Sequence, residues 1–257
     1  MGATHKVTSE YHYYSFCNKK HKKCLLKLYL FAIFVAYNNQ LITLMQKIST
    51  YKDRALSTLS GQWGSAALVT FVCLFIYYGI YFVIALFTMH YFEVANATIA
   101  YNYGWIATLL LLPMIWSYTV MFLDFKRKEN LTVSKLFVGF NEFGRIFLTM
   151  LLEYVYITLW TFLFVIPGFV KAYSYAMTPY VLRDDPQISY DAAISRSMKL
   201  MKGHKLQLFL LDLSFIGWVI LSCCTLGIGF LFLLPYVNTA HAHFYEDLLK
   251  EEAQDTF

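Results

Sequence analysis

Five stretches of this sequence are each long and apolar enough to cross a lipid bilayer as a single helix. The hydrocarbon core of a bilayer is about 30 Å thick, and a helix needs about 20 mostly apolar residues to cross it. The stretches lie at residues 68–87, 105–123, 146–166, 206–225 and 226–243. The sequence therefore predicts an all-α, polytopic membrane protein.

The composition favours a membrane over an aqueous environment. Apolar residues make up 58% of the chain and charged residues 14%, whereas soluble domains average about 45–50% and about 25%. The net charge of +5 arises in residues 1–44, which hold six lysines and one glutamate, because the other 15 basic and 15 acidic residues cancel. Since no basic face is concentrated in the remainder, we expect the lipid bilayer, and no nucleic acid, as a partner.

The distribution of lysine and arginine decides whether residues 169–182, a shorter apolar stretch, also cross the membrane. Basic residues in short loops favour the cytoplasmic side. Segments 126–145 and 183–205 hold five basic residues each, so both are expected inside, and the chain between them has to cross twice, turning at Pro167 and Gly168. The resulting topology has about six transmembrane helices in three hairpins, with both termini inside. It places fourteen of the fifteen basic residues after position 44 on the cytoplasmic side.

Residues 1–44 do not fit this pattern. Their apolar stretch, 25–37, has basic residues on both sides, so no orientation satisfies the charge rule, and no signal-peptide cleavage pattern follows it. Because the sequence from Met45 resembles a natural protein start, we expect residues 1–44 to be a non-native extension; the alternative is an interfacial helix. Residues 45–248 would then form a single membrane domain and residues 249–257 an acidic cytoplasmic tail.

Each predicted hairpin is preceded by a segment of mixed polarity that ends in glycine. These segments are residues 51–61, 133–144 and 189–203. In the third, Ser189 can cap a helix, and Ile194, Met198 and Met201 share one face at helical spacing. The pattern predicts an amphipathic helix in the cytoplasmic headgroup layer, with a solvated linker helix as the alternative.

Short motifs rich in glycine, proline and aromatic residues recur between residues 51 and 248. They include Gly61-Gln62-Trp63-Gly64, Phe143-Gly144-Arg145, Ile166-Pro167-Gly168, Lys171-Ala172-Tyr173-Ser174-Tyr175, Met201-Lys202-Gly203-His204-Lys205, Asp212-Leu213-Ser214-Phe215-Ile216-Gly217-Trp218 and Phe244-Tyr245-Glu246-Asp247-Leu248. Through these motifs the chain resembles domain of unknown function 975, a family of bacterial membrane proteins. His204 departs from the asparagine expected there. The resemblance implies a multi-pass protein of the bacterial inner membrane and supplies no activity.

Two acidic residues fall inside predicted crossings, where a charge is costly. Glu153 lies eight residues beyond Arg145, and Asp212 seven residues beyond Lys205. At 1.5 Å per residue, both lie about 10–12 Å from the inner ends of their helices. They are candidates for a shared proton or cation site if their helices touch. The alternative is that each accepts hydrogen bonds from neighbouring helices.

A second set of candidates lies in residues 169–182. Lys171, Ser174, Tyr175 and Thr178 follow one another at helical spacing and form a polar stripe. Such a stripe could line a water-filled path or contact a lipid headgroup. The alternative for Lys171 is that its ammonium group reaches the outer headgroups along the membrane surface.

The last predicted helix carries Asn238, His241 and Tyr245 on one face. His241 and His243 are two residues apart and diverge on a helix, so they do not form a metal-binding pair. The sequence also lacks a zinc-protease motif, a nucleophile elbow and a nucleotide-binding loop. We therefore predict no catalytic residues, no metal site and no cofactor.

These features favour a non-catalytic membrane protein that handles a lipid, a peptide or a small solute, or that supports a transport assembly. Membrane protein partners or a homo-oligomer are compatible with it. Two alternatives stay open. One is a membrane-embedded enzyme that uses Glu153 or Asp212, and the other is a purely structural partner subunit.

Overall fold

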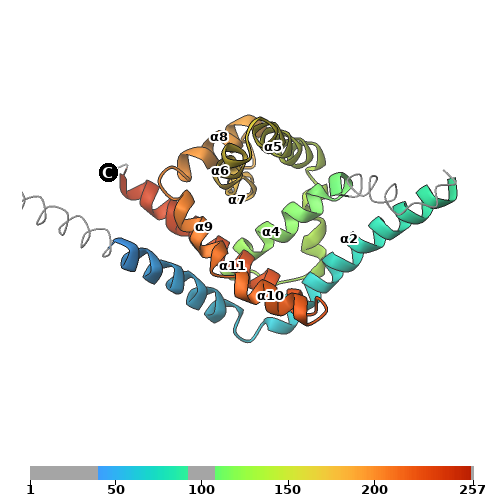
Figure 1. The fold of residues 1–257 in the computed structure, drawn as a ribbon, viewed down its shortest axis with the longest axis horizontal. Coiled ribbons are helices and arrows are strands. Elements are labelled where there is room, and N and C mark those ends of the chain that lie inside the picture. Colours follow the sequence, from blue (N-terminus) through green and yellow to red (C-terminus); the bar gives the residue numbers. More distant parts are fainter. Residues whose placement is uncertain (1–39, 92–107, 256–257) are drawn as a thin grey trace, which may run out of the picture. The chain divides into compact units, whose positions relative to one another are not determined.

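The computed structural model describes residues 40–91 and 108–255. Residues 1–47 and 48–257 form two units; in the first, the described residues 40–47 are helical. The second unit contains a helix over residues 48–59 and then α2 (Trp63–Tyr91), α4 (Leu112–Lys126), the 3-10 helix η1 (Val133–Phe140), α5 (Phe143–Leu163), α6 (Val165–Tyr175), α7 (Thr178–Asp184), α8 (Tyr190–Leu200), α9 (Lys205–Leu213), α10 (Ile216–Cys224) and α11 (Phe230–Asp255) (Figure 1). The described residues include no strand, so the predicted all-α fold is confirmed.

Among the described residues, three helical segments are long and apolar enough to cross a membrane. They are Trp63–Phe87, Phe143–Leu163 and Lys205–Cys224, the last made of α9 and α10. The predicted crossing at 169–182 is divided between α6 and α7, and neither it nor the crossings at 105–123 and 226–243 meets the same criterion within the described residues. Membrane association is therefore supported, whereas six crossings remain a prediction.

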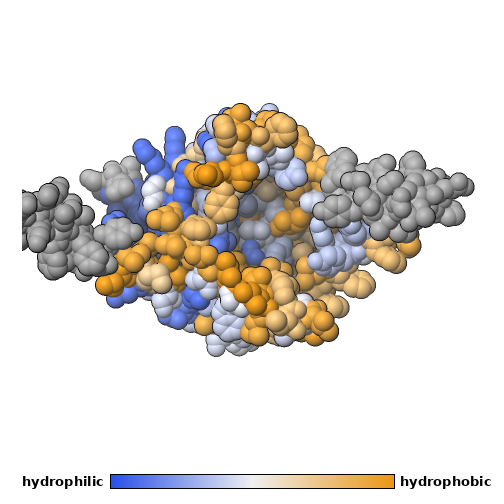
Figure 2. Space-filling view, in the orientation of Figure 1, coloured by the Kyte–Doolittle hydropathy of each residue, from blue (hydrophilic) through white to orange (hydrophobic). Residues whose placement is uncertain are grey.

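The outward-facing side chains of these helices are strongly apolar. Phe162 near the end of α5 is 94% exposed, Ile166 in α6 is 78% exposed and Leu226 before α11 is 95% exposed. Figure 2 shows such residues gathered over α5 and α10. Soluble proteins rarely expose contiguous apolar patches of this kind, so lipid is the solvent that suits this surface.

The helix α4 provides much of the buried core. Its side chains Met114, Phe122 and Leu123 are fully buried, and the helix packs against η1, α5, α7 and α11. The hydroxyl groups of Thr70 in α2 and Tyr118 in α4 are hydrogen-bonded at 2.9 Å. This buried pair joins α2 to α4 and restricts the rotation of the two helices about their axes.

The chain turns between α5 and α6 at Phe164, not at Pro167 and Gly168 as predicted. Phe164 is in an extended conformation (φ −156°, ψ 136°), and Pro167 lies in the first turn of α6, where its missing N–H costs no hydrogen bond. Gly168 instead lets the two helices approach, because a Cβ atom there would lie 2.6 Å from Thr161 Cα. The glycine signal therefore marked a helix contact rather than a turn.

The start of α5 lies beside the end of α7. The guanidinium group of Arg145 is 3.4 Å from the carbonyl oxygens of Leu182 and Asp185. Between Arg145 and Leu182 the chain runs away from this contact along α5 and returns to it along α6 and α7. The same three elements hold five of the candidate residues: Glu153, Lys171, Ser174, Tyr175 and Thr178.

The helix predicted at 189–203 exists as α8, but its apolar face packs inside the protein. Ile194 is 1% exposed and Met201 is fully buried, and Ser189 precedes the helix without a side-chain cap bond. Ser197, which is also buried, accepts a hydrogen bond from Met177 N (3.2 Å) and donates one to Ser174 O (3.0 Å). Placement of this face in the headgroup layer is therefore wrong, because it covers the junction between α6 and α7 instead.

Candidate functional site

A cluster of hydrogen-bonded polar side chains joins the helices α6, α9 and α11. His241 Nε2 lies 2.6 Å from Asp212 Oδ1, and the Tyr173 hydroxyl donates to Asp212 Oδ2 at 3.1 Å. A neutral imidazole satisfies the first contact by donating its Nε2 proton, and a protonated one makes an ion pair. We call Tyr173, Asp212 and His241 the polar cluster.

The polar cluster lies close to interruptions in all three of its helices. The helix α6 ends at Tyr175, and α7 begins at Thr178. A second interruption, two residues after Asp212, separates α9 from α10. Pro235 interrupts the hydrogen bonding of α11, six residues before His241. Interrupted helices are where membrane proteins place backbone polar groups next to a bound solute.

Side chains from other elements satisfy part of the freed backbone. The ammonium group of Lys52 lies 3.4 Å from Ser214 O, at the interruption between α9 and α10. The Ser197 hydroxyl serves the interruption between α6 and α7, as described above. An aromatic ring also packs against the polar cluster: the ring of Phe209 lies edge-on to that of Tyr173, with 5.8 Å between the ring centroids.

Of the two acids predicted to share a site, only Asp212 belongs to the polar cluster. Its hydrogen-bond partners are Tyr173 and His241, and no contact with Glu153 is recorded among the described residues. Glu153 lies in α5, within hydrogen-bonding reach of Thr178 in α7. The structure thus supports the alternative for Asp212, in which its carboxylate is paired with groups on neighbouring helices.

The stripe predicted in residues 169–182 faces neighbouring helices rather than a water-filled path. The Lys171 ammonium lies 5.0 Å from the ring of Trp160 in α5 and 3.8 Å from the sulfur of Met198 in α8. The cation therefore lies against an aromatic face, and contact with the outer headgroups stays a prediction. The hydroxyls of Ser174 and Thr178 are buried and bond to carbonyls of their own chain segment, and Tyr175 is 3% exposed.

The three side chains on the predicted face of the last helix bond to different elements. Asn238 bonds to Leu234 O within α11 at 2.9 Å. Tyr245 donates to Asp184 of α7 at 3.0 Å. Of the three residues on that face, only His241 joins the polar cluster.

Comparison with known proteins identifies the family. A family model described as "Protein of unknown function (DUF975)" matches residues 45–174 and 163–252. The chain belongs to the DUF975 family. Tyr173, Asp212 and His241 all lie within the matched residues of this DUF975 protein. No curated protein and no solved structure matches the chain.

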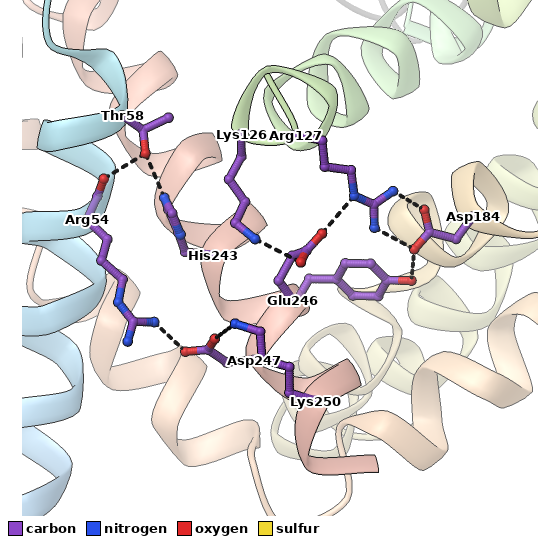
Figure 3. Close-up of polar contacts among 10 residues, drawn as sticks. Arg54, Thr58, Lys126, Arg127, Asp184, His243, Glu246, Asp247 and Lys250 are labelled. Atoms are coloured by element: carbon purple, nitrogen blue, oxygen red, sulfur yellow. Dashed lines mark hydrogen bonds and ion pairs between the residues drawn. The ribbon is translucent and has the colours of Figure 1, made fainter. Parts of the chain in front are cut away.

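The DUF975 protein also contains a network of charges that sequence reasoning did not predict. Arg127 at the end of α4 donates to both carboxylate oxygens of Asp184 (2.5 and 2.9 Å) and to Glu246 (2.7 Å). Lys126 also contacts Glu246 (2.8 Å), and Arg54 contacts Asp247 (2.6 Å). Figure 3 shows that these side chains converge from four segments. We call these residues the charge network: Arg54, Lys126, Arg127, Asp184, Glu246 and Asp247.

The charge network changes the titration of one of its members. Burial raises the pKa of the Glu246 carboxyl, but hydrogen bonds from Lys126 and Arg127 outweigh it and hold that pKa below its usual range. Glu246 therefore stabilises the fold in its ionised form. A sequence signal for the network did exist, since acidic residues at 184 and 246–247 match basic ones at 126–127, but it did not reveal which residues pair.

An apolar cavity of about 460 Å³ lies among α2, α10, α11 and the helix at 48–59. It is lined by Leu56, Trp63, Trp218, Leu221, Ser222, Thr225, Gly229, Phe232, Leu233 and Tyr236. The cavity and the polar cluster share the helix α11, in which Tyr236 precedes His241 by five residues. A ligand with an apolar body would fit the cavity, because ligand pockets are lined mainly by apolar and aromatic side chains.

Proposed function

We propose that this DUF975 protein is a six-span protein of the bacterial inner membrane that binds and handles a lipid-like amphipathic ligand without catalysing a reaction. In this proposal both termini are cytoplasmic. The observation that carries the ligand assignment is the apolar cavity, whose lining contains no charged side chain. The topology and the ligand are tested separately below.

The charge network supports the proposed topology. Its residues come from the helix at 48–59, the end of α4, the end of α7 and the last part of α11. In the proposed topology each of these positions is cytoplasmic. Ion pairs between them require that they lie together on one side, and the six-span arrangement satisfies that requirement.

Cysteine labelling tests the topology. In a variant without the native cysteines, Asn96→Cys is expected to react with an impermeant maleimide added outside, because residues 90–104 connect the first two predicted crossings on the outer side in this topology. Residues 92–104 lie outside the described residues. Asn130→Cys, in the segment between α4 and η1, is expected to react only after permeabilisation. Reaction of both cysteines from the same side would contradict the topology.

The apolar lining supports a lipid-like ligand over a hydrophilic solute. The lining contains no charged side chain, and two of its hydroxyls are bonded within the chain. Ser222 donates to Trp218 O at 2.8 Å, and Thr225 donates to Ser222 O at 2.9 Å. A hydrophilic solute would lose its hydration here for few new hydrogen bonds, whereas an acyl chain has no hydrogen bonds to water to lose.

A pair of tryptophan substitutions tests the ligand assignment. Leu221 lines the cavity, whereas its exposed neighbour Ile220 does not. A phospholipid with a diazirine in its acyl chain is expected to crosslink to residues 222–236 in the wild-type chain. Leu221→Trp fills part of the cavity and is expected to reduce that crosslinking several-fold, measured by peptide mass spectrometry. Ile220→Trp is the matched control and should leave it unchanged.

Crosslinking that is equal in both variants would contradict the ligand assignment, because it would show that the phospholipid contacts only the outer surface of the helices. The topology would be untouched by that result. Conversely, a failed labelling pattern for Asn96→Cys and Asn130→Cys would leave the cavity in place.

A further inference from the structure

A carboxyl group outside the polar cluster has no partner for one of its oxygens. Glu153 Oε2 in α5 is buried and has no hydrogen-bond partner among the described residues. Leaving an ionised carboxylate oxygen buried and unpaired is strongly unfavourable, and groups in that position take up a counter-charge or a proton. Glu153 therefore holds either a counter-charge or a proton.

The hydroxyl of Thr178 indicates a proton. Thr178 is fully buried, and its hydroxyl donates to the carbonyl of Tyr175 at 2.6 Å. A threonine hydroxyl has a single hydrogen and two acceptor lone pairs. Towards Glu153, which lies within hydrogen-bonding reach, Thr178 therefore offers only an acceptor. A hydrogen bond between the two groups then requires the carboxyl group to be the donor.

Cations on α5 itself and on two helices that pack against it, α6 and α8, are engaged elsewhere. Lys171 in α6 lies against the rings of Trp160 and Tyr175. Arg145, two turns earlier in α5, pairs with Glu142 at 2.7 Å. In α8, which also packs against α5, Arg196 pairs with Glu252 of α11 at 3.6 Å. The phenol of Tyr175 is the other ionisable group that interacts with Glu153, and it carries no positive charge.

We propose that Glu153 forms an exchangeable proton-binding site between α5 and α7, with the Thr178 hydroxyl as acceptor. The site goes beyond the proposed ligand-binding function and shares no residue with the polar cluster or the cavity. It lies where α6 ends and α7 begins, next to backbone held by Ser197 of α8. Loss of the proton would place a charge at this junction.

A hydrophobic carbodiimide tests the site in the full chain within native membranes. Dicyclohexylcarbodiimide adds the O–H of a protonated carboxylic acid across its C=N bond, and the adduct rearranges to a stable N-acylurea without losing any atom. Modification is expected at Glu153 in mildly acidic buffer and should decrease several-fold in alkaline buffer. Glu142, which is ion-paired at the start of the same helix, is the matched acid and should stay unmodified.

One variant and one salt comparison make the result decisive. Glu153→Gln is expected to abolish the modification and to keep the wild-type melting temperature, because glutamine is a neutral isostere of the protonated acid. An unmodified Glu153 in acidic buffer, in a chain that melts like the folded protein, would overturn the proposal. Protection by sodium chloride, but not by choline chloride at equal ionic strength, would also overturn it by assigning the site to a metal cation.

Discussion

Replacing Asp212 by leucine is expected to lower the free energy of unfolding by about 1–4 kcal/mol. The substitution removes two interhelical hydrogen bonds, to His241 and to Tyr173, and such bonds contribute about 0.6–2 kcal/mol each in a membrane. It also leaves an imidazole and a phenol without a partner between three helices. Thermal unfolding in detergent and the amount of protein in the membrane measure the effect.

Asp212→Asn is the matched control. An asparagine retains the shape of aspartate, can accept from His241 and can donate to the Tyr173 oxygen. We expect it to fold and accumulate like the wild-type chain. If the asparagine and leucine variants are destabilised equally, the side chain acts through its packing, and the hydrogen-bond account of the polar cluster is wrong.

Arg127→Ala is expected to destabilise the protein by about 2–3 kcal/mol. Hydrogen bonds to charged groups contribute about 1.5–3 kcal/mol, but the Arg127 side chain is 37% exposed, so solvent screens part of the effect. Alanine leaves the carboxylates of Asp184 and Glu246 facing each other. Arg127→Lys keeps the charge and loses the two-pronged contact with Asp184, so it should fall between. Chemical unfolding in detergent measures both variants.

Lys202→Ala is the control for removal of a positive charge, because Lys202 lies exposed after α8. It should leave stability unchanged. The wild-type protein is also expected to lose stability on acidification, because the lowered pKa of Glu246 contributes stability above its unfolded value of about 4.3, and this is lost as pH falls. Arg127→Ala should show a smaller loss over that range. An equal pH dependence would contradict the charge network.

The helical class was predictable because runs of apolar residues can be recognised in the sequence without knowing which helices pack together. Runs of apolar residues identify α2, α5 and the pair α9 and α10 directly, since a chain in lipid can satisfy its backbone only by forming helices or closed barrels. The family resemblance was also confirmed. Both depend on local sequence alone.

The polar cluster was only partly predictable because depth along a helix does not determine rotation about it. Glu153 and Asp212 were expected at similar distances from the inner ends of their helices, yet Asp212 pairs with His241, 29 positions further along the chain, and not with Glu153. His241 and Tyr245 share a face of α11, but that helix is long enough for one to reach Asp212 and the other Asp184. Such pairs depend on which helices are neighbours.

The role of α8 shows a second limit. Its large apolar residues correctly indicated an apolar face, but Ser197 was not expected to matter. The hydroxyl of Ser197 satisfies backbone atoms of Met177 and Ser174 where α6 ends. The interruption itself follows from tertiary packing, so a residue that compensates for it carries no signal in its own segment.

The charge network makes the resistance of the bundle to opening unequal along its length. Four segments are joined by ion pairs near Glu246, whereas Phe162 near the end of α5 and Leu226 between α10 and α11 are exposed and apolar. If the helices lie in a bilayer as proposed, separating them at those ends exposes apolar side chains to lipid at little cost. For the proposed ligand-binding function, we therefore expect sideways entry from the bilayer at the end of the bundle most distant from the charge network.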